Sequence, residues 1–137
     1  MALADPDPIG AIFDTSILVA QEQGRPLRAV RLPSSPAISV VTLAELRLAV
    51  FNAVDTTAQA FRLQTLERAL KVRAIPIDET IAFNWTVLRS AARSLSQGRI
   101  NDLWIAATAM ALQVPVVTQD EGFCRLAEVG GPEAILV

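Results

Sequence analysis

The pattern that decides the fold first appears in residues 11–24, AIFDTSILVAQEQG. A short apolar run, residues 11–13, ends at an acidic residue, Asp14, and a helix-forming stretch, residues 16–23, follows it. Short continuous apolar runs are typical of strands that are buried on both faces of a sheet. The pattern therefore predicts a buried strand that leads directly into a helix.

The same alternation continues along the rest of the chain. Further strands are predicted at residues 37–41, 74–77, 114–118 and 134–137, and further helices at 43–54, 57–72, 78–96, 103–112 and 123–129. Asp78 is a predicted N-cap, and the stretch 103–112 is apolar on nearly every face, which predicts a helix buried within the domain. The alternation indicates an α/β fold, a three-layer sandwich with a mostly parallel central sheet flanked by helices. A chain of 137 residues fits a single domain, residues 1–137.

The composition excludes several kinds of enzyme. The chain contains no His and no Tyr, which removes Ser–His–Asp and Cys–His nucleophilic systems and the usual zinc ligand sets. The single cysteine, Cys124, excludes an internal disulfide and is interpreted as a packing residue. Any chemistry is therefore expected to come from carboxylates.

Composition also bears on location and partners. The first ten residues lack the basic and apolar regions of a signal peptide, and no apolar stretch is long enough to span a bilayer. We therefore expect a cytoplasmic protein without a membrane segment. Because 52% of the residues are hydrophobic, we expect both fully buried elements and an apolar patch that binds a partner.

Four acidic residues are placed so that they should converge. Asp14 ends the first predicted strand, and Asp120 lies two residues past the fourth. Because functional sites form outside the carboxyl ends of parallel strands, both residues are expected at that edge of the sheet. Glu45 lies in a helix that starts at the same edge, and Asp102 opens the apolar helix.

Two of these acids also have a purely structural interpretation. Thr42 and Glu45 fit a capping box, with Thr42 at the N-cap, so capping is an alternative role for Glu45. An acid at a helix N-terminus is stabilised by the helix dipole, which is an alternative role for Asp102. The sequence leaves both alternatives open.

A cluster of four carboxylates has a chemical consequence. Two unit charges about 4 Å apart near a protein surface repel one another by on the order of 4 kcal/mol. Raised pKa values or bound cations relieve this repulsion. An all-oxygen ligand set favours Mg²⁺ or Mn²⁺, which can align a phosphodiester and activate a water molecule. The acids therefore predict metal-dependent hydrolysis of phosphodiesters.

Four segments resemble, in order and spacing, the motifs of PIN-domain nucleases. They are residues 12–16 (IFDTS), 40–46 (VVTLAEL), 101–109 (NDLWIAATA) and 117–120 (VTQD). The compact length further resembles the VapC-type toxins of bacterial toxin–antitoxin pairs. The resemblance implies Mg²⁺- or Mn²⁺-dependent endonucleolytic cleavage of RNA, with tRNA or rRNA among the substrates. It also implies a homodimer, silenced by a small antitoxin whose C-terminal segment occupies the active-site groove.

The resemblance carries over to particular residues. Acidic catalytic and metal-binding positions are matched by Asp14, Glu45, Asp102 and Asp120, and supporting hydroxyl positions by Thr15, Ser16 and Thr118. Many relatives carry one more acid two residues past the fourth motif's acid, where this chain has Gly122. The number of metal ions, one or two, is therefore left open, and Glu121 is not expected to replace the missing acid.

Two other functions are alternatives to the nuclease. A phosphotransferase that forms an aspartyl-phosphate needs a second Asp where this chain has Ser16, and an active-site Lys, whereas Lys71 ends a predicted helix. A catalytically silent PIN-like scaffold is the other alternative, and the intact set of four acids argues against it. An apolar groove for an antitoxin helix is predicted from Leu46, Val50, Phe51, Phe61 and Leu66, with core packing as the alternative role of these residues.

Overall fold

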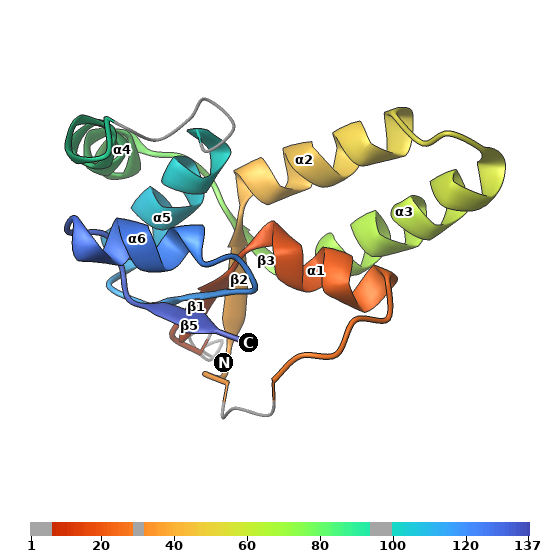
Figure 1. The fold of residues 1–137 in the computed structure, drawn as a ribbon, viewed down its shortest axis with the longest axis horizontal. Coiled ribbons are helices and arrows are strands. Elements are labelled where there is room, and N and C mark those ends of the chain that lie inside the picture. The colour runs from red at the N-terminus through yellow and green to blue at the C-terminus, as the bar shows by residue number, and fades with distance from the viewer. Residues whose placement is uncertain (1–6, 29–31, 94–99) are drawn as a thin grey trace, which may run out of the picture.

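The computed structural model describes residues 7–28, 32–93 and 100–137, and its centre is a sheet of five parallel strands (Figure 1). The strands are β1 (Ala11–Phe13), β2 (Pro36–Ser39), β3 (Arg73–Ile75), β4 (Val116–Thr118) and β5 (Ala134–Leu136). They lie in the order β3-β2-β1-β4-β5, and every neighbouring pair is parallel. The chain thus builds outward from β1 on one side and then returns to add β4 on the other. In open α/β sheets, ligands bind beyond the carboxyl ends of the strands at such a reversal.

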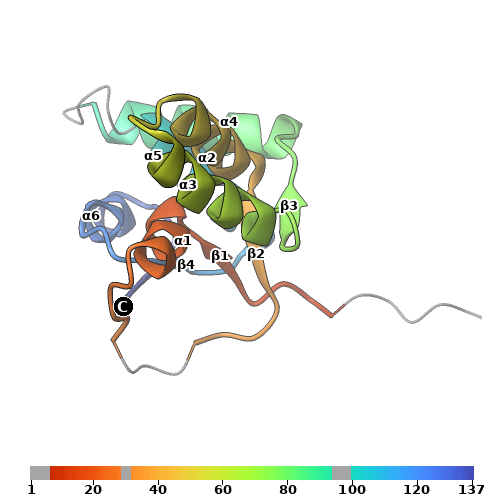
Figure 2. The ribbon, with the colours of Figure 1, turned by 90° about the vertical axis from the view of Figure 1, so that its right-hand side faces the viewer.

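Helices cover both faces of this sheet. They are α1 (Thr15–Glu22), α2 (Val40–Phe51), α3 (Thr56–Ala69), α4 (Glu79–Ala91), α5 (Ile100–Leu112) and α6 (Gly122–Glu128). Helices α1, α2 and α3 pack on one face, and α4, α5 and α6 pack on the other. Figures 1 and 2 show α2 and α3 side by side as a hairpin that extends beyond the sheet. The predicted three-layer sandwich is confirmed, with a sheet that is entirely parallel.

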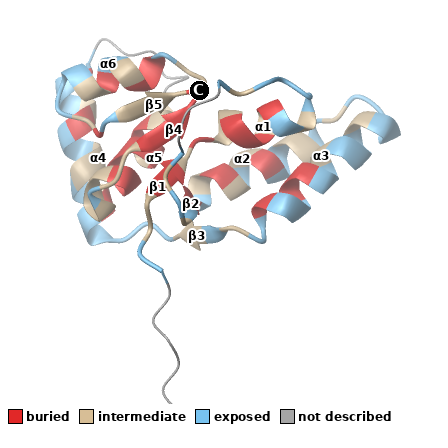
Figure 3. Ribbon diagram, turned by 90° about the horizontal axis from the view of Figure 1, so that it is seen from below, coloured by how far each residue is buried: buried red, intermediate tan, exposed pale blue. Residues whose placement is uncertain are grey.

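The core lies on both sides of the strands because successive strand residues face opposite ways. Ile12 and Val116 pack with α4, α5 and α6, whereas Ala11 and Val117 pack with Ile17 of α1. Helix α5 is buried as its sequence predicts, and its inaccessible side chains include Ile105, Ala107 and Ala109. Figure 3 shows the buried residues concentrated in the strands and on the helix faces turned toward them.

The start of α2 differs from the prediction. The sequence predicts a strand through residue 41 and an N-cap at Thr42, but β2 ends at Ser39 and α2 begins one residue later. Ser39 is the N-cap, and its Oγ accepts a hydrogen bond from the Val41 N–H at 3.1 Å. Pairing with β3 stops where Ser39 aligns with Ile75, the last residue of β3, so the backbone beyond has no strand partner and enters a helix. The capping-box prediction is therefore wrong, and Glu45 lies in the second turn of α2.

The other boundaries are close to the predicted ones. Asp78 is the N-cap of α4, as predicted, and accepts a hydrogen bond from the Ile81 N–H at 2.9 Å. The predicted end of this helix at residue 96 lies outside the described residues.

None of the described helices combines the length and the apolar character that crossing a membrane requires.

Candidate active site

Asp14 follows directly after β1 and has only 4% of its surface exposed. Its Oδ2 accepts a hydrogen bond from Ser16 Oγ at 2.7 Å and another from Thr118 Oγ1 at 2.9 Å. Asp14 stands at the N-cap position of α1, yet its side chain makes no capping hydrogen bond. The carboxylate is therefore oriented chiefly by two hydroxyl groups, and the backbone N–H groups of Thr15 and Ser16 at the start of α1 add weaker interactions that also lower its pKa.

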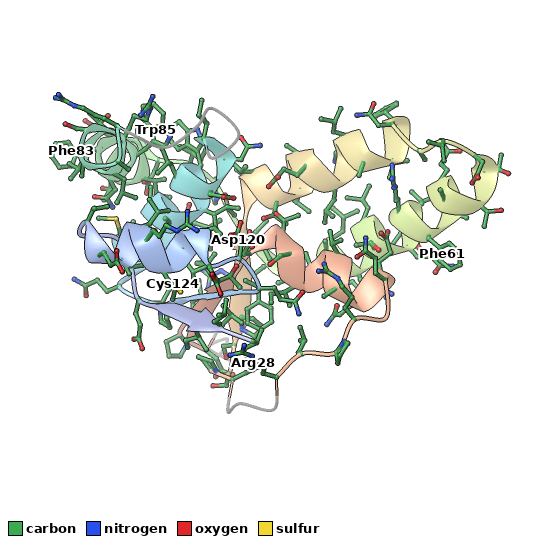
Figure 4. All side chains as sticks on the ribbon, in the orientation of Figure 1. Arg28, Phe61, Phe83, Trp85, Asp120 and Cys124 are labelled. Atoms are coloured by element: carbon green, nitrogen blue, oxygen red, sulfur yellow. The ribbon has the colours of Figure 1, made fainter. Side chains whose placement is uncertain are left out.

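A single hydroxyl links Asp14 to Asp120. Thr118 is the last residue of β4, and its hydroxyl donates a hydrogen bond to Asp14 and accepts one from the Asp120 backbone N–H at 2.9 Å. The Gly122 N–H then donates to Asp120 Oδ1 at 2.8 Å. Figure 4 shows Asp120 between α1 and α6. Since β1 and β4 are neighbours, the structure brings Asp14 and Asp120 to the same edge of the sheet, as the strand ends predict.

Glu45 is held by the residue that follows Asp14. Thr15 Oγ1 donates to Glu45 Oε1 at 2.9 Å and lies 2.9 Å from Thr42 Oγ1. Because a hydroxyl carries one proton, the Thr42 hydroxyl must be the donor of the second bond. The Asn101 side chain, in the first turn of α5, also hydrogen-bonds the Glu45 carboxylate. Helices α1, α2 and α5 therefore meet around this one carboxylate.

Burial raises the pKa of both Asp14 and Glu45 above the ordinary value. For Asp14, the hydrogen bonds from Ser16 and Thr118 oppose the effect of burial on the pKa. For Glu45, the hydrogen bond from Thr15 opposes it, and the negative charge of Asp14 raises the pKa further. The two carboxylates are thus close enough to repel one another. Their joint ionisation is unfavourable unless a positive charge lies nearby.

Asp102 lies in the first turn of α5 beside Asn101 and is half-buried. It therefore stands at the same end of α5 as the Asn101 side chain that contacts Glu45. Within residues 7–28, 32–93 and 100–137, no three acidic or cysteine side chains are grouped closely enough to hold a metal ion. The structure brings Asp14 together with Glu45 and with Asp120. Metal ligation by all four acids stays a prediction.

The donor set suits a hard cation. All the candidate ligands are carboxylate oxygens, the chain has no His, and its single cysteine, Cys124, is half-buried on α6. Mg²⁺ and Mn²⁺ prefer oxygen ligands. The mutual repulsion of Asp14 and Glu45 is also what a divalent ion would relieve. The residues present therefore fit Mg²⁺ or Mn²⁺.

A groove of about 430 Å³ opens beside Glu45, between α1 and the α2–α3 hairpin. Glu45 and Asn101 line it, together with the apolar side chains of Val19 and Leu46. Arg62 of α3 also lines the groove, and its Nη1 is fixed by a 2.7 Å hydrogen bond to a backbone carbonyl of α2. The candidate site is thus reached through a groove whose lining combines apolar side chains with the charged side chains of Glu22, Glu45 and Arg62.

The sequence profile of the PIN domain matches residues 11–129, which contain all four acids. The chain belongs to the PIN-domain family. The resemblance drawn from the four motifs is therefore confirmed at the level of the family. The match covers every described element of this PIN domain from β1 to α6.

Relatives of this PIN domain resemble it over nearly its whole length. Ribonuclease VapC5 of Mycobacterium tuberculosis is 43% identical over 131 residues, 95% of this chain and 97% of the relative. Ribonuclease VapC4 of the same species is 38% identical over 122 residues, 87% and 92% of the two chains. Among solved structures, this chain resembles VapBC-5 from M. tuberculosis, a member of the VapBC family of toxin–antitoxin systems. The TM-score is 0.81 at 41% identity, and the match covers 95% of this chain and 100% of that one. FitAcB of Neisseria gonorrhoeae has a TM-score of 0.67 at 25% identity, covering 91% and 96%.

Two residues of the PIN-domain site escape prediction from the sequence. Asn101 contacts Glu45, and Thr42 contacts Thr15. A signal for Asn101 exists, because it stands beside Asp102 at the start of the third motif. Thr42 offers no such signal, since its fit to an N-cap position pointed to another role.

Proposed function

We propose that this protein is a Mg²⁺- or Mn²⁺-dependent endoribonuclease and the toxin of a type II toxin–antitoxin pair. The observation that carries the proposal is the pair Asp14 and Glu45, two mutually repelling carboxylates held by Ser16, Thr118 and Thr15 beside the carboxyl end of β1. The similarity to Ribonuclease VapC5 over 95% of this chain supports RNA as the substrate, with tRNA and rRNA as candidates.

Each side chain of the site has a part in this proposal. The acids that would hold the ion are Asp14, Glu45, Asp102 and Asp120. A bound divalent ion lowers the pKa of a water molecule and offsets the negative charge of the reacting phosphate. Ser16 and Thr118 fix the direction of the Asp14 carboxylate, and Thr15 fixes that of Glu45.

Metal-dependent stability is the first test of this proposal. Mn²⁺ added to EDTA-treated protein should raise the Tm, because an ion that binds only the folded state stabilises it by about 2.7 kcal/mol at a hundredfold excess over its Kd. Asp102→Asn should abolish the increase. The matched variant Asp7→Asn, at an exposed position, should keep it. A wild-type protein that shows no response would favour the catalytically silent scaffold.

The same measurement should depend on pH. In the folded, metal-free protein the pKa of Asp14 lies above 3.8 and that of Glu45 above 4.5. The two groups therefore stabilise the fold when the pH is below these values. This stability is lost as the pH rises through their pKa values in the folded protein. Mn²⁺ competes with protons for the carboxylates. The increase in Tm should therefore be larger at pH 7 than at pH 5. An increase of equal size at both would argue against these two residues as ligands.

Thr118→Val tests the hydroxyl that links Asp14 to Asp120. Val has a similar shape but removes both hydrogen bonds of this hydroxyl. Losing a group that orients a metal ligand costs about 10- to 100-fold in metal affinity or activity. Cleavage measured over a range of Mn²⁺ concentrations should therefore require more Mn²⁺. Thr57→Val, at an exposed position on α3, is the control, and a lower Tm with an unchanged Mn²⁺ dependence would indicate a purely structural role.

The proposed antitoxin would bind the exposed part of the α2–α3 hairpin. Of the apolar residues predicted to line its groove, Leu46 and Leu66 are buried in the core, whereas Phe51 and Phe61 have 83% and 54% of their surface exposed. Figure 4 shows Phe61 on α3, on the part of the hairpin that extends away from the sheet. The similarity to VapBC-5 supports a cognate antitoxin. The proposal also includes a homodimer. It includes a cytoplasmic location because the proposed RNA substrates are found there.

A further inference from the structure

A second groove, of about 460 Å³, lies along α4. Its lining is Trp85, Thr86, Arg89, Ser90 and Arg93. The first four of these residues lie in α4 at spacings that place them on one face of the helix. Arg93 follows just beyond the last residue of α4, Ala91. No described carboxylate lines the groove. Arg89 and Arg93 are the charged residues of this lining, so the groove is positively charged.

One wall of this groove is Trp85, whose ring packs against a second aromatic ring. Trp85 stacks on Trp104 of α5, with ring centroids 4.9 Å apart and 17° between the ring planes. Figure 4 shows Trp85 on α4, on the opposite side of the molecule from the α2–α3 hairpin. The Trp85 Nε1–H is buried and has no hydrogen-bond partner among the described residues. The wall is therefore fixed by ring packing, and it contains a donor that no described atom satisfies.

The groove leads toward the end of α5 that carries Asp102. Asn84 of α4 donates a hydrogen bond to the Ala107 carbonyl at 3.4 Å, and the stacked tryptophans lie further toward the N-terminus of α5. The two helices are therefore antiparallel. Arg89 lies further along α4 in this direction, and Arg93 follows the end of the helix, while the first turn of α5 contains Asp102. The positive site is thus displaced from the candidate active site but lies toward the same end of the domain.

We infer that this groove on α4 binds the phosphate backbone of the RNA substrate outside the catalytic centre. The inference rests on the proposed function, because the ligand is the same RNA. The guanidinium groups of Arg89 and Arg93 match phosphate oxygens in a bidentate arrangement. The Ser90 hydroxyl adds a donor of the kind that contacts nucleic-acid backbones, whereas the Thr86 hydroxyl donates to the Ala82 carbonyl within α4. No bond is made or broken in the groove, which contributes affinity and orientation.

Intrinsic fluorescence gives a direct binding assay at this groove. The chain contains two tryptophans, and these are the stacked pair at the groove. A cleavage-resistant 2′-O-methyl RNA oligonucleotide, titrated into the full-length protein, should change their emission. Arg89→Gln/Arg93→Gln should weaken this binding. Lys71→Gln/Arg73→Gln is the matched control, since it removes the same charge from exposed positions at the amino end of β3.

The size of the effect follows from counterion release. Each contact with a single-stranded backbone adds about 0.7 to the slope of log affinity against log salt, so two lost contacts should lower the slope by about 1.4 and the affinity near 0.15 M salt by about tenfold. In cleavage assays the double glutamine variant should show a KM raised about tenfold with kcat unchanged. Arg89→Lys/Arg93→Lys keeps the charges and should keep the salt slope.

The possible failures can be told apart. If the wild-type protein and the control variant cleave no RNA, the proposed function is wrong. If they cleave RNA while Arg89→Gln/Arg93→Gln retains wild-type affinity, salt slope and KM, the α4 groove is not an RNA contact. Unchanged RNA binding with an altered oligomeric state in that variant would assign the groove to contact between protein chains and would equally overturn the inference.

Discussion

Asp14→Asn is expected to lower RNA cleavage by at least about 100-fold while leaving the protein folded. Asn has the size of Asp, and its carbonyl oxygen can still accept the hydrogen bonds from Ser16 and Thr118. It lacks the negative charge that would hold a divalent ion. Because burial raises the pKa of Asp14, ionisation of this residue destabilises the metal-free fold, and the variant should melt at or above the wild-type Tm in EDTA.

Two measurements check this result. Purified wild type, Asp14→Asn and the exposed control Asp7→Asn are compared for cleavage of labelled RNA in Mn²⁺, and only Asp14→Asn should be inactive. In cells, brief induction of the wild type should arrest growth and create new RNA ends, which sequencing would locate. Asp14→Asn should produce neither effect. Normal growth of cells that contain abundant, catalytically intact protein would contradict the toxin proposal.

Phe123→Ala is expected to lower the free energy of unfolding by about 3–5 kcal/mol. Phe123 is 1% exposed and packs with α4 and α5 in the core on that face of the sheet. A loss of this size is a large fraction of the roughly 5–15 kcal/mol that stabilises a typical domain. Phe123 also follows Gly122, whose N–H holds Asp120, so loosening α6 should reduce activity as well.

Urea denaturation of Phe123→Ala and Phe51→Ala separates this effect from the loss of an aromatic ring in general. Phe51 is 83% exposed on α2, and its replacement should change the stability by no more than about 0.5 kcal/mol. A cost for Phe123→Ala below about 1 kcal/mol would mean that α6 is not an integral part of the core.

The positions of Asp14 and Asp120 could be predicted because they depend on local information. An apolar run identifies a strand. The polar residue that follows the strand then lies at the carboxyl edge of the parallel sheet. The burial of helix α5 could be predicted for the same reason, because its sequence is apolar on nearly every face. Both predictions depend only on the local sequence of polar and apolar residues. Neither depends on the length of another strand or helix.

The surroundings of Glu45 could not be predicted in this way. The end of β2 is set by the length of β3, with which Ser39 makes the last pair, and that length is a property of a distant segment. Because the start of α2 was predicted a few residues too late, Thr42 was assigned to the N-cap position. In the structure its buried hydroxyl contacts that of Thr15. The apolar residues of the hairpin show the same dependence, because the sequence does not tell which side of each helix faces α1.

The two hydroxyls beside Asp14 have a consequence for how its position depends on the sheet. Oδ2 of Asp14 accepts one hydrogen bond from Ser16 and one from Thr118. Ser16 belongs to α1, whereas Thr118 is the last residue of β4. One oxygen atom is thus tied to two segments about a hundred residues apart, so the direction of this carboxylate reports whether β1 and β4 are correctly paired.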